Sequence, residues 1–402
     1  MIRRFIFIGM LLCLDIYIYT ALRQLILEST SQIKLIVNLV YWSLSFISLS
    51  YFITYFAFGT DWLSKSVVLY WRSIAIIGIG SKIPIIAVLA IDDIRRLFTW
   101  TINANASRSN FMIKAGLALG SLPFISLIYG LIRNPYRYKL YQSDVGIDNL
   151  PSDLHGLRIV QISDIHSGSF TFKEPLKNAI EMINQQKPDL VFFTGDLVNS
   201  IASEMEPYID IFDKIVSKYG IYSVLGNHDY GDYHRWESQA DKVANMDRLK
   251  AIHKELGWQL LLNEHDVVDV NGSSVGIIGV ENISGKMHFK IYGDMQKASV
   301  NCPDCDVKIL LSHDPSHWDK EVTKSYKDVN LTLSGHTHGM QFGIEIPGFI
   351  KFSPIQFVYK KWAGLYKEGN QYLYVNRGLG FLGYPGRVGI LPEITLLELK
   401  SV

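Results

Sequence analysis

Long apolar stretches dominate the first third of the chain. They cover residues 5–22, 33–58, 67–91 and 111–132, and each is close to the roughly 20 residues that a helix needs to cross a bilayer. No Ala-x-Ala-like cleavage site follows the first stretch, so we expect it to be retained in the protein. The pattern predicts an all-α transmembrane domain with a bundle of about four helices over residues 1–135.

From residue 136 onward, short apolar runs of strand length alternate with amphipathic segments of helix length. Helices are expected at about 175–186, 206–219 and 241–256. Helices between strands, followed by a strand-rich part, are typical of two packed sheets with helices outside. Residues 136–402 are therefore predicted to form an α/β domain. Its later strands are expected at 274–279, 308–312, 331–334, 372–376 and 394–399.

Composition narrows the classes of function. The formal net charge of +1 leaves no electrostatic footprint for nucleic acid. A chain of 402 residues can bury an ample core without a disulfide framework. Of the three cysteines, Cys302 and Cys305 form a Cys-Pro-Asp-Cys sequence that lacks the second pair of a zinc site. A redox couple is the alternative, but an inert pair is favoured because nothing else redox-like accompanies it.

Basic residues near the span ends indicate the orientation of the membrane domain. Their bias is slight and favours the cytoplasmic side for the amino terminus and, after four spans, for the large second domain. The residues on that side would be Arg3, Arg4, Lys65, Arg133, Arg137 and Lys139, and those on the other side Arg23, Lys34, Arg95, Arg96 and Arg108.

Three charged residues, Asp15, Arg72 and Lys82, fall within the apolar stretches. Charges in a bilayer are costly, which makes a relay or a ligand path the functional hypothesis. The alternative is that Arg72 reaches toward a span end and that Asp15 pairs with Lys82 inside the bundle. We favour this alternative because the sequence shows no repeat or broken helix of the kind that transporters use.

Polar clusters follow five short apolar runs, which end near residues 163, 194, 224, 312 and 334. Because strand ends open onto one crevice above a sheet, we expect these side chains to lie together. In the Asp-x-His and His-x-His pairs, the alternation of a strand would place both side chains on one face. The clustered side chains are Asp164, His166, Asp196, Asn227, His228, Asp229, His313, His336 and His338.

The cluster has the inventory of a metal site. Its candidate ligands offer oxygen and nitrogen but no thiolate, and they outnumber what one tetrahedral zinc uses. Two hard or borderline divalent ions are therefore favoured over a structural zinc, and manganese, iron and zinc all remain open as the metal. The carboxylate of Asp196 has two oxygens and can bridge both ions. The candidate ligands are Asp164, His166, Asp196, Asn227, His313, His336 and His338.

The order Asp-x-His, Gly-Asp, Gly-Asn-His-Asp, His, Gly-His-x-His resembles the calcineurin-like metallophosphoesterase superfamily, from about residue 140 to the carboxyl end. The tail at 374–380 and 392–399 looks like its branch of membrane-anchored bacterial phosphoesterases. The resemblance implies a four-layer α/β/β/α sandwich with the active site at the strand ends.

The same resemblance implies roles for the clustered residues. His228 would act near the leaving group as a proton donor or charge stabiliser, and Asp229 would orient its ring. The reaction would be hydrolysis of a phosphoester or phosphoanhydride by a hydroxide that bridges two ions about 4 Å apart. One ion would be held by Asp164, His166, Asp196 and His338, and the other by Asp196, Asn227, His313 and His336.

The substrate is suggested by an apolar segment, residues 340–362, which follows the last metal motif. Its lysines and Trp362 would suit a lipid headgroup region or an acyl chain. A lid or a core segment between the sheets is an equally good interpretation. Together with the membrane spans, the segment favours an amphiphilic substrate such as a lipid-linked nucleotide diphosphate. Asp314 is expected to be a turn residue because Pro315 follows it.

Two other functions remain as alternatives. One is a metal-binding membrane sensor or regulatory protein with little catalytic turnover, against which the complete ligand set and His228 argue. The other is a transporter with a regulatory soluble domain, against which the lack of inverted repeats argues.

Overall fold

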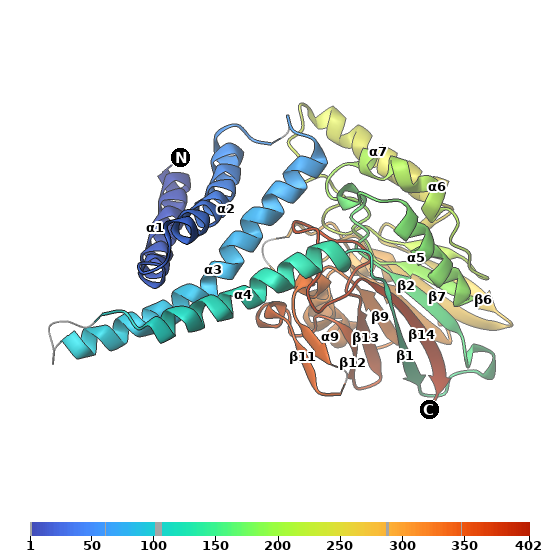
Figure 1. The fold of residues 1–402 in the computed structure, drawn as a ribbon. Helices are drawn as coiled ribbons and strands as arrows, with labels where there is room; N and C mark the ends of the chain where they lie inside the picture. Colours follow the sequence, from blue (N-terminus) through green and yellow to red (C-terminus); the bar gives the residue numbers. More distant parts are fainter. Residues whose placement is uncertain (1, 61, 101–106, 287–288, 347) are drawn as a thin grey trace. The chain divides into compact units, whose positions relative to one another are not determined.

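The structure is a computed structural model that describes residues 2–60, 62–100, 107–286, 289–346 and 348–402 (Figure 1). The chain divides into two compact units. The first comprises Met1–Ile132 with Gly383–Pro385, and the second comprises Arg133–Leu382 with Gly386–Val402.

The first unit is helical. Within its described residues, four helices are long and apolar enough to cross a membrane. The predicted all-α bundle of four spans is therefore confirmed. Two of its helices pack very closely, because a Cβ added at Gly120 would lie 2.7 Å from the carbonyl oxygen of Ser81, as is common for small residues between membrane helices. The helices are α1 (Ile2–Leu25), α2 (Ser31–Ala57), α3 (Lys65–Trp100) and α4 (Asn110–Arg133).

Helix α3 is longer than the apolar stretch at 67–91 that predicted it. Its last turns are polar and are held by two ion pairs, 2.8 Å between Arg95 and Asp92 and 2.9 Å between Arg96 and Asp93. Such pairs, one turn apart, stabilise a helix in water. Hydropathy thus located the part of the helix suited to the bilayer but not its polar end.

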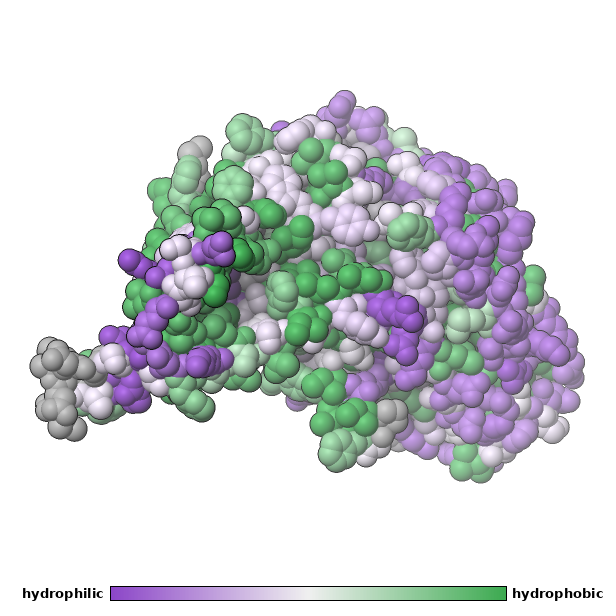
Figure 2. Space-filling view, viewed as in Figure 1, coloured by the Kyte–Doolittle hydropathy of each residue, from purple (hydrophilic) through white to green (hydrophobic). Residues whose placement is uncertain are grey.

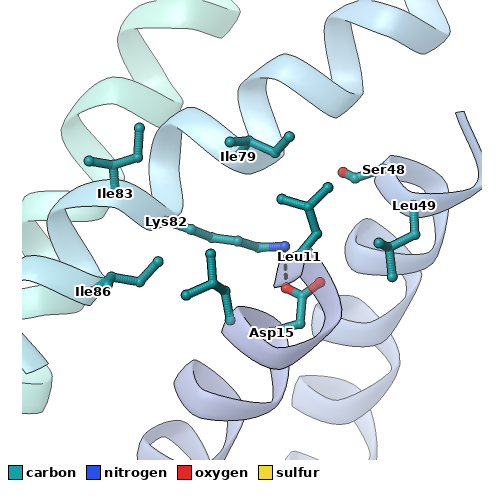
Figure 3. Close-up of a pocket in the computed structure, with 9 residues that line it drawn as sticks. Leu11, Asp15, Ser48, Leu49, Ile79, Lys82, Ile83 and Ile86 are labelled. Carbon is teal, nitrogen blue, oxygen red and sulfur yellow. Dashed lines mark ion pairs between the residues drawn. The ribbon is translucent and has the colours of Figure 1, made fainter. Parts of the chain in front are cut away.

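Asp15 and Lys82 form an ion pair inside the first unit. Figure 3 shows Lys82 reaching from α3 toward Asp15 on α1, among leucine and isoleucine side chains. Asp15 is only 2% exposed, and Ser45 of α2 donates a hydrogen bond of 2.9 Å to its Oδ1. The predicted pairing is confirmed, and it accounts for both charges within the membrane domain without a relay.

The second unit contains two six-stranded mixed sheets and a two-stranded hairpin. The first sheet has the order β1-β14-β2-β3-β4-β5 and the second the order β12-β13-β9-β8-β7-β6. The first sheet consists of β1 (Lys139–Ile147), β14 (Glu393–Ser401), β2 (Arg158–Ile162), β3 (Leu190–Phe193), β4 (Ile221–Ser223) and β5 (Gln259–Leu260). The second consists of β12 (Gly364–Glu368), β13 (Gln371–Val375), β9 (Leu331–Ser334), β8 (Val307–Leu311), β7 (Ser273–Gly279) and β6 (Glu264–Val270), and the hairpin of β10 (Ile344–Ile346) and β11 (Ile350–Phe352).

Central strands such as β3, β8 and β9 are buried on both faces because helices cover the outer face of each sheet. Alternate residues of β8 show this, since Ile309 belongs to the core between the sheets and Leu310 to the core beneath the outer helices. Helix α5 buries Leu176, Ala179, Ile180 and Ile183 against the first sheet, which is the spacing of one helical face. The predicted α/β/β/α sandwich is confirmed. Its helices are α5 (Glu174–Gln185), α6 (Ile209–Phe212), α7 (Gln239–Glu255), α8 (Met295–Ser299) and α9 (Thr323–Ser325).

The predicted helix at 206–219 is wrong beyond Phe212, where α6 ends. The side chain of Asn184, just before the end of α5, binds the backbone that follows α6. Its NH₂ group donates to the carbonyl of Lys214 at 2.9 Å, and its oxygen accepts the N–H of Val216 at 3.1 Å. These bonds replace helical ones. Val216 is 59% exposed.

Candidate metal centre

Five loops meet at one edge of the two sheets, each at the carboxyl end of a parallel strand. The predicted ligands all line this edge. Asp164 and His166 follow β2, Asp196 follows β3, Asn227 and His228 follow β4, His313 follows β8, and His336 and His338 follow β9.

The backbone of these loops is unusual. Five candidate ligands have a left-handed conformation, which side chains rarely adopt and which is typical of functional sites held by their surroundings. The paired motifs therefore converge through sharp turns beyond the strand ends, and not through strand alternation as the sequence suggested. The φ angles are 51° for Asp164, 47° for His166, 61° for Asp196, 72° for His336 and 50° for His338.

The first group of ligand atoms comes from Asp164, His166 and His338, which are all buried and lie within 4.8 Å of one another. Nε2 of His338 is 3.2 Å from Oδ1 of Asp164 and 3.0 Å from Nε2 of His166. Carboxylate oxygen and imidazole nitrogen at such separations fit a shared borderline divalent cation.

The second group comes from Asp196, His313 and His336, again within 4.8 Å. Nε2 of His313 is 3.3 Å from Nδ1 of His336, which is 2.8 Å from Oδ1 of Asn227. Nδ1 of His313 donates to the carbonyl of Thr194 at 2.7 Å. This bond fixes the ring and leaves Nε2 for a cation, as is usual for histidine ligands.

Asp196 joins the two groups. Its Oδ2 lies 3.5 Å from Nε2 of His166 and 3.1 Å from Nε2 of His313. Its Oδ1 accepts the backbone N–H of His228 at 2.8 Å. The β3 and β4 loops approach closely here, since a Cβ at Gly226 would lie 2.2 Å from Oδ1 of Asp196. Glycine is therefore required at this position.

The electrostatics favour ligation. Burial raises the pKa of Asp196, but His313, His228 and His166 around it together outweigh burial and hold that pKa well below its usual value. Burial lowers the pKa of His166 to about 3 and also lowers that of His336. Burial likewise lowers the pKa of His313, but Asp196 reverses the effect and raises it to about 10. In the absence of a metal ion, a proton on His313 therefore balances the negative charge of Asp196. A bound cation would balance the same charge.

His228 lies beside the two groups. Its ring centroid is 4.9 Å from that of His166 and 4.4 Å from that of Tyr233. Nδ1 donates to the carbonyl of Asn199 at 2.7 Å. This bond assigns the tautomer and leaves Nε2 as the ring atom that can exchange a proton.

Asp229 does not orient the His228 ring, which corrects the expectation from the family resemblance. Asn199 takes that place. The buried carboxylate of Asp229 instead accepts backbone N–H groups at 2.8–3.2 Å, so it holds the β3 and β4 loops together. The donors are the N–H groups of Asp196, Leu197, Val198 and Gly226.

One further residue of the site, Tyr359, was not predicted from the sequence. Tyr359 places its hydroxyl 2.9 Å from Nε2 of His336 and 3.3 Å from Oδ2 of Asp314. Asp314 lies in a turn, as expected, since its carbonyl accepts the N–H of His317 at 3.1 Å. Its buried carboxylate also supports the contacts behind His336. No motif spacing marks Tyr359, because it lies in the apolar segment between two motifs.

The two groups open into a cavity of about 490 Å³. Its polar side carries five of the candidate ligands, His166, Asp196, Asn227, His336 and His338, together with His228, and Lys286 lies at its wall. The remaining wall is apolar and includes Phe289, Ile355, Val358 and Leu382. A phosphate group at the ligands would therefore have an apolar surface beside it.

The apolar segment 340–362 is divided in the structure. Trp362 is buried at 3% exposure, and its carbonyl accepts the hydroxyl of Thr337 at 2.6 Å. The suggestion that Trp362 enters a headgroup region is therefore wrong, since it is part of the domain core. The hairpin earlier in the segment is exposed.

Comparison with known families identifies both parts of the chain. Residues 2–135 match the family described as "Probable Calcineurin-like phosphoesterase, transmembrane domain". Residues 157–340 match the family described as "Calcineurin-like phosphoesterase".

Individual relatives agree with these matches. A "Transmembrane protein with metallophosphoesterase domain" of Danio rerio is 30% identical over 281 residues, 68% of this chain and 60% of the relative. The "Uncharacterized metallophosphoesterase YkuE" of Bacillus subtilis is 31% identical over 283 residues, 68% of this chain and 90% of the relative. This chain therefore spans less than two thirds of the length of the first and most of the second.

Proposed function

Since the chain belongs to the calcineurin-like metallophosphoesterase family, we propose that it hydrolyses a phosphoester or phosphoanhydride bond with two divalent metal ions. Membrane helices and a phosphoesterase domain in one chain make it a membrane-embedded phosphoesterase. The number of ions, their identity and the nature of the substrate are the parts that we propose.

The observation that carries the proposal is the position of Asp196 between the two groups. Its Oδ2 is within 3.5 Å of a histidine from each group, which is the arrangement that a bridging carboxylate requires. One ion would be held by Asp164, His166, Asp196 and His338. The other would be held by Asp196, Asn227, His313 and His336. Manganese, iron or zinc would suit this set of nitrogen and oxygen donors.

The chain's own residues would divide the chemistry. When bound, the ions would supply Lewis-acid stabilisation of the phosphoryl oxygens and a water of lowered pKa. Lys286 at the cavity wall would attract the anionic phosphate. His228 would hold or donate a proton at Nε2 beside the leaving oxygen, while its bond to Asn199 keeps the ring oriented.

The apolar half of the cavity supports an amphiphilic substrate. A phosphate ester bound at the ligands would place its organic group against Phe289, Ile355 and Val358. A lipid-linked phosphoester or a nucleotide-lipid fits this wall and the membrane location. The slight bias of basic residues places the active site on the cytoplasmic side in our proposal.

The test measures metal content and turnover on the same samples. The full chain, purified in detergent and stripped of metal, is titrated with Mn²⁺ and assayed with bis(p-nitrophenyl) phosphate and p-nitrophenyl phosphate. His228→Ala is expected to keep both ions and lose roughly 10²–10⁴-fold in rate. The matched control is His234→Ala, an exposed histidine nearby in the same stretch of chain, which should change neither quantity.

The outcomes separate hydrolase from sensor. Metal-dependent turnover that falls in His228→Ala supports the hydrolase. Two bound ions with no turnover of soluble or lipid phosphoesters would support a metal-binding sensor. Failure to bind a second ion would refute the dinuclear site itself.

A further inference from the structure

The β10–β11 hairpin is inverted with respect to an ordinary surface hairpin. Its register pairs Ile344 with Phe352 and Ile346 with Ile350, and side chains alternate between the faces of a strand. These four apolar residues therefore share one face, and their exposed fractions are 54%, 38%, 49% and 38% respectively.

The polar face of the hairpin points into the domain. Oε1 of Glu345 is 2.5 Å from Nη2 of Arg377, and Oε2 accepts the hydroxyl of Tyr141 at 3.3 Å. Lys351, opposite Glu345, donates to the carbonyl of Ala363. The domain thus binds the charged side chains of the hairpin and leaves the apolar ones outside. A sheet that faces water shows the opposite arrangement.

The turn and the segment after the hairpin extend this exposed face. Phe349 and Phe357 are each 80% exposed and Val358 is 53% exposed. Figure 2 shows the hairpin end as a hydrophobic patch. A contiguous apolar patch on a folded domain marks an interaction site. We call it the apolar hairpin surface, formed by Ile344, Ile346, Phe349, Ile350, Phe352, Phe357 and Val358.

The apolar hairpin surface is continuous with the candidate metal centre. Val358 belongs to this surface and also lines the cavity. Ile355, in the short turn Pro354–Phe357 just before it, lines the cavity as well. The ring of Phe357 lies 6.5 Å from that of Phe352. An apolar path therefore leads from the outer face of the hairpin to the edge of the cavity.

We propose that the apolar hairpin surface docks into the headgroup and acyl boundary of the bilayer in which the chain is anchored. Because the membrane helices anchor the chain in that bilayer, the lipid is always close enough for this surface to contact it. Phenylalanine and isoleucine are typical of surfaces that lie in this boundary. The exposed Lys360 follows the surface in sequence and suits anionic headgroups.

Docking would bring the cavity mouth to the lipid surface. A phosphoester amphiphile could then pass its phosphate to the candidate ligands while its acyl part stays against the apolar wall. This consequence rests on the proposed function, whereas the docking itself does not. Measurements of depth and of hydrolysis therefore test the two separately.

The experiment places a fluorophore on the apolar hairpin surface of the full chain. Cys13, Cys302 and Cys305 are replaced by serine, and single cysteines are introduced as Phe349→Cys, Phe357→Cys or the control Lys177→Cys, which lies on α5 and is 54% exposed. Each protein is labelled with a bimane and reconstituted in vesicles of phosphatidylcholine and phosphatidylglycerol. Quenching by doxyl-labelled lipid is compared with quenching by aqueous iodide.

Docking predicts that labels at 349 and 357 are quenched by doxyl lipid at least roughly fivefold more than the label at 177, and are protected from iodide. Iodide quenching without lipid quenching at 349 and 357 would refute the proposal. Protection from both quenchers would also refute it, because protein would then cover the surface, either the chain's own helices or a second copy.

Hydrolysis of bis(p-nitrophenyl) phosphate by the same labelled proteins reports on the metal centre independently. Lipid quenching without hydrolysis would support docking and count against the hydrolase. Hydrolysis without lipid quenching would support the hydrolase and refute docking.

Discussion

The carboxylate of Asp229 accepts the backbone N–H of Asp196, with 2.8 Å between Oδ2 and the nitrogen. The acid that follows His228 in sequence thus secures the backbone of the residue that joins the two groups of ligands. Three more backbone N–H groups donate to the same carboxylate. Asp229 is therefore a positioning residue for the ligand loops.

We predict that Asp229→Asn lowers both stability and metal affinity. An asparagine would turn an NH₂ toward backbone donors, and leaving such buried groups unpaired costs about 1–3 kcal/mol. Thermal unfolding in detergent and Mn²⁺ titration measure the two effects. Asp210→Asn, with a side chain that is 74% exposed, is the control and should change neither. Unaltered stability in Asp229→Asn would contradict the positioning role.

Asp196→Asn should affect both ions at once. The amide keeps one neutral oxygen but loses the charge that faces His166 and His313. We expect the bound metal to fall from two ions to one or none, and turnover to fall by roughly a hundredfold or more. Replacing even a residue that only supports a metal ligand typically lowers metal affinity or activity by about 10–100-fold. Elemental analysis of the purified variant gives the metal content. Two retained ions would show that Asp196 does not bridge.

Tyr359→Phe removes only a hydroxyl. Because that hydroxyl lies 2.9 Å from Nε2 of His336, its loss should leave the ring less fixed and weaken metal binding by roughly 10–100-fold. The affinity for Mn²⁺, measured calorimetrically, should change more than the unfolding temperature. The matched control is Tyr219→Phe, whose hydroxyl bonds to Asn271 at the surface. Equal affinities in the two variants would remove Tyr359 from the metal centre.

In the membrane domain, Lys82→Met should be strongly destabilising. It leaves Asp15 buried and unpaired, and breaking a buried pair costs about 3–5 kcal/mol. The double variant Asp15→Leu with Lys82→Met should recover most of that loss, because apolar residues can replace a buried pair. Tryptophan fluorescence during heating reports the unfolding of each variant. A double variant as unstable as the single one would show that the two charges act separately.

The ligand cluster was predictable because its signals are local. Each polar pair follows an apolar run, and parallel strands with their carboxyl ends at one edge bring such pairs together. The partner of Asp229 could not be predicted in this way. A histidine followed by an aspartate suggests contact between the two side chains, but the loop turns the carboxylate toward the backbone after β3.

The hairpin shows a different limit of the sequence. Ile344-Glu345-Ile346 and Ile350-Lys351-Phe352 alternate as strands should, and this period of two is visible in the sequence. It does not say which face is turned inward. Arg377, which follows β13, decides the orientation by pairing with Glu345. Arg377 lies in the tail at 374–380, but nothing in that stretch of sequence connects it with Glu345.

The strand order of the first sheet bears on how the protein is made. β1 (Lys139–Ile147) follows the membrane spans directly, yet it pairs along its length with β14 (Glu393–Ser401), which separates it from β2. During synthesis, β1 leaves the ribosome about 250 residues before its partner, at roughly 5–20 residues per second. Until β14 is synthesised, the nascent domain carries an open sheet edge. Truncation before residue 393 would leave that edge open permanently.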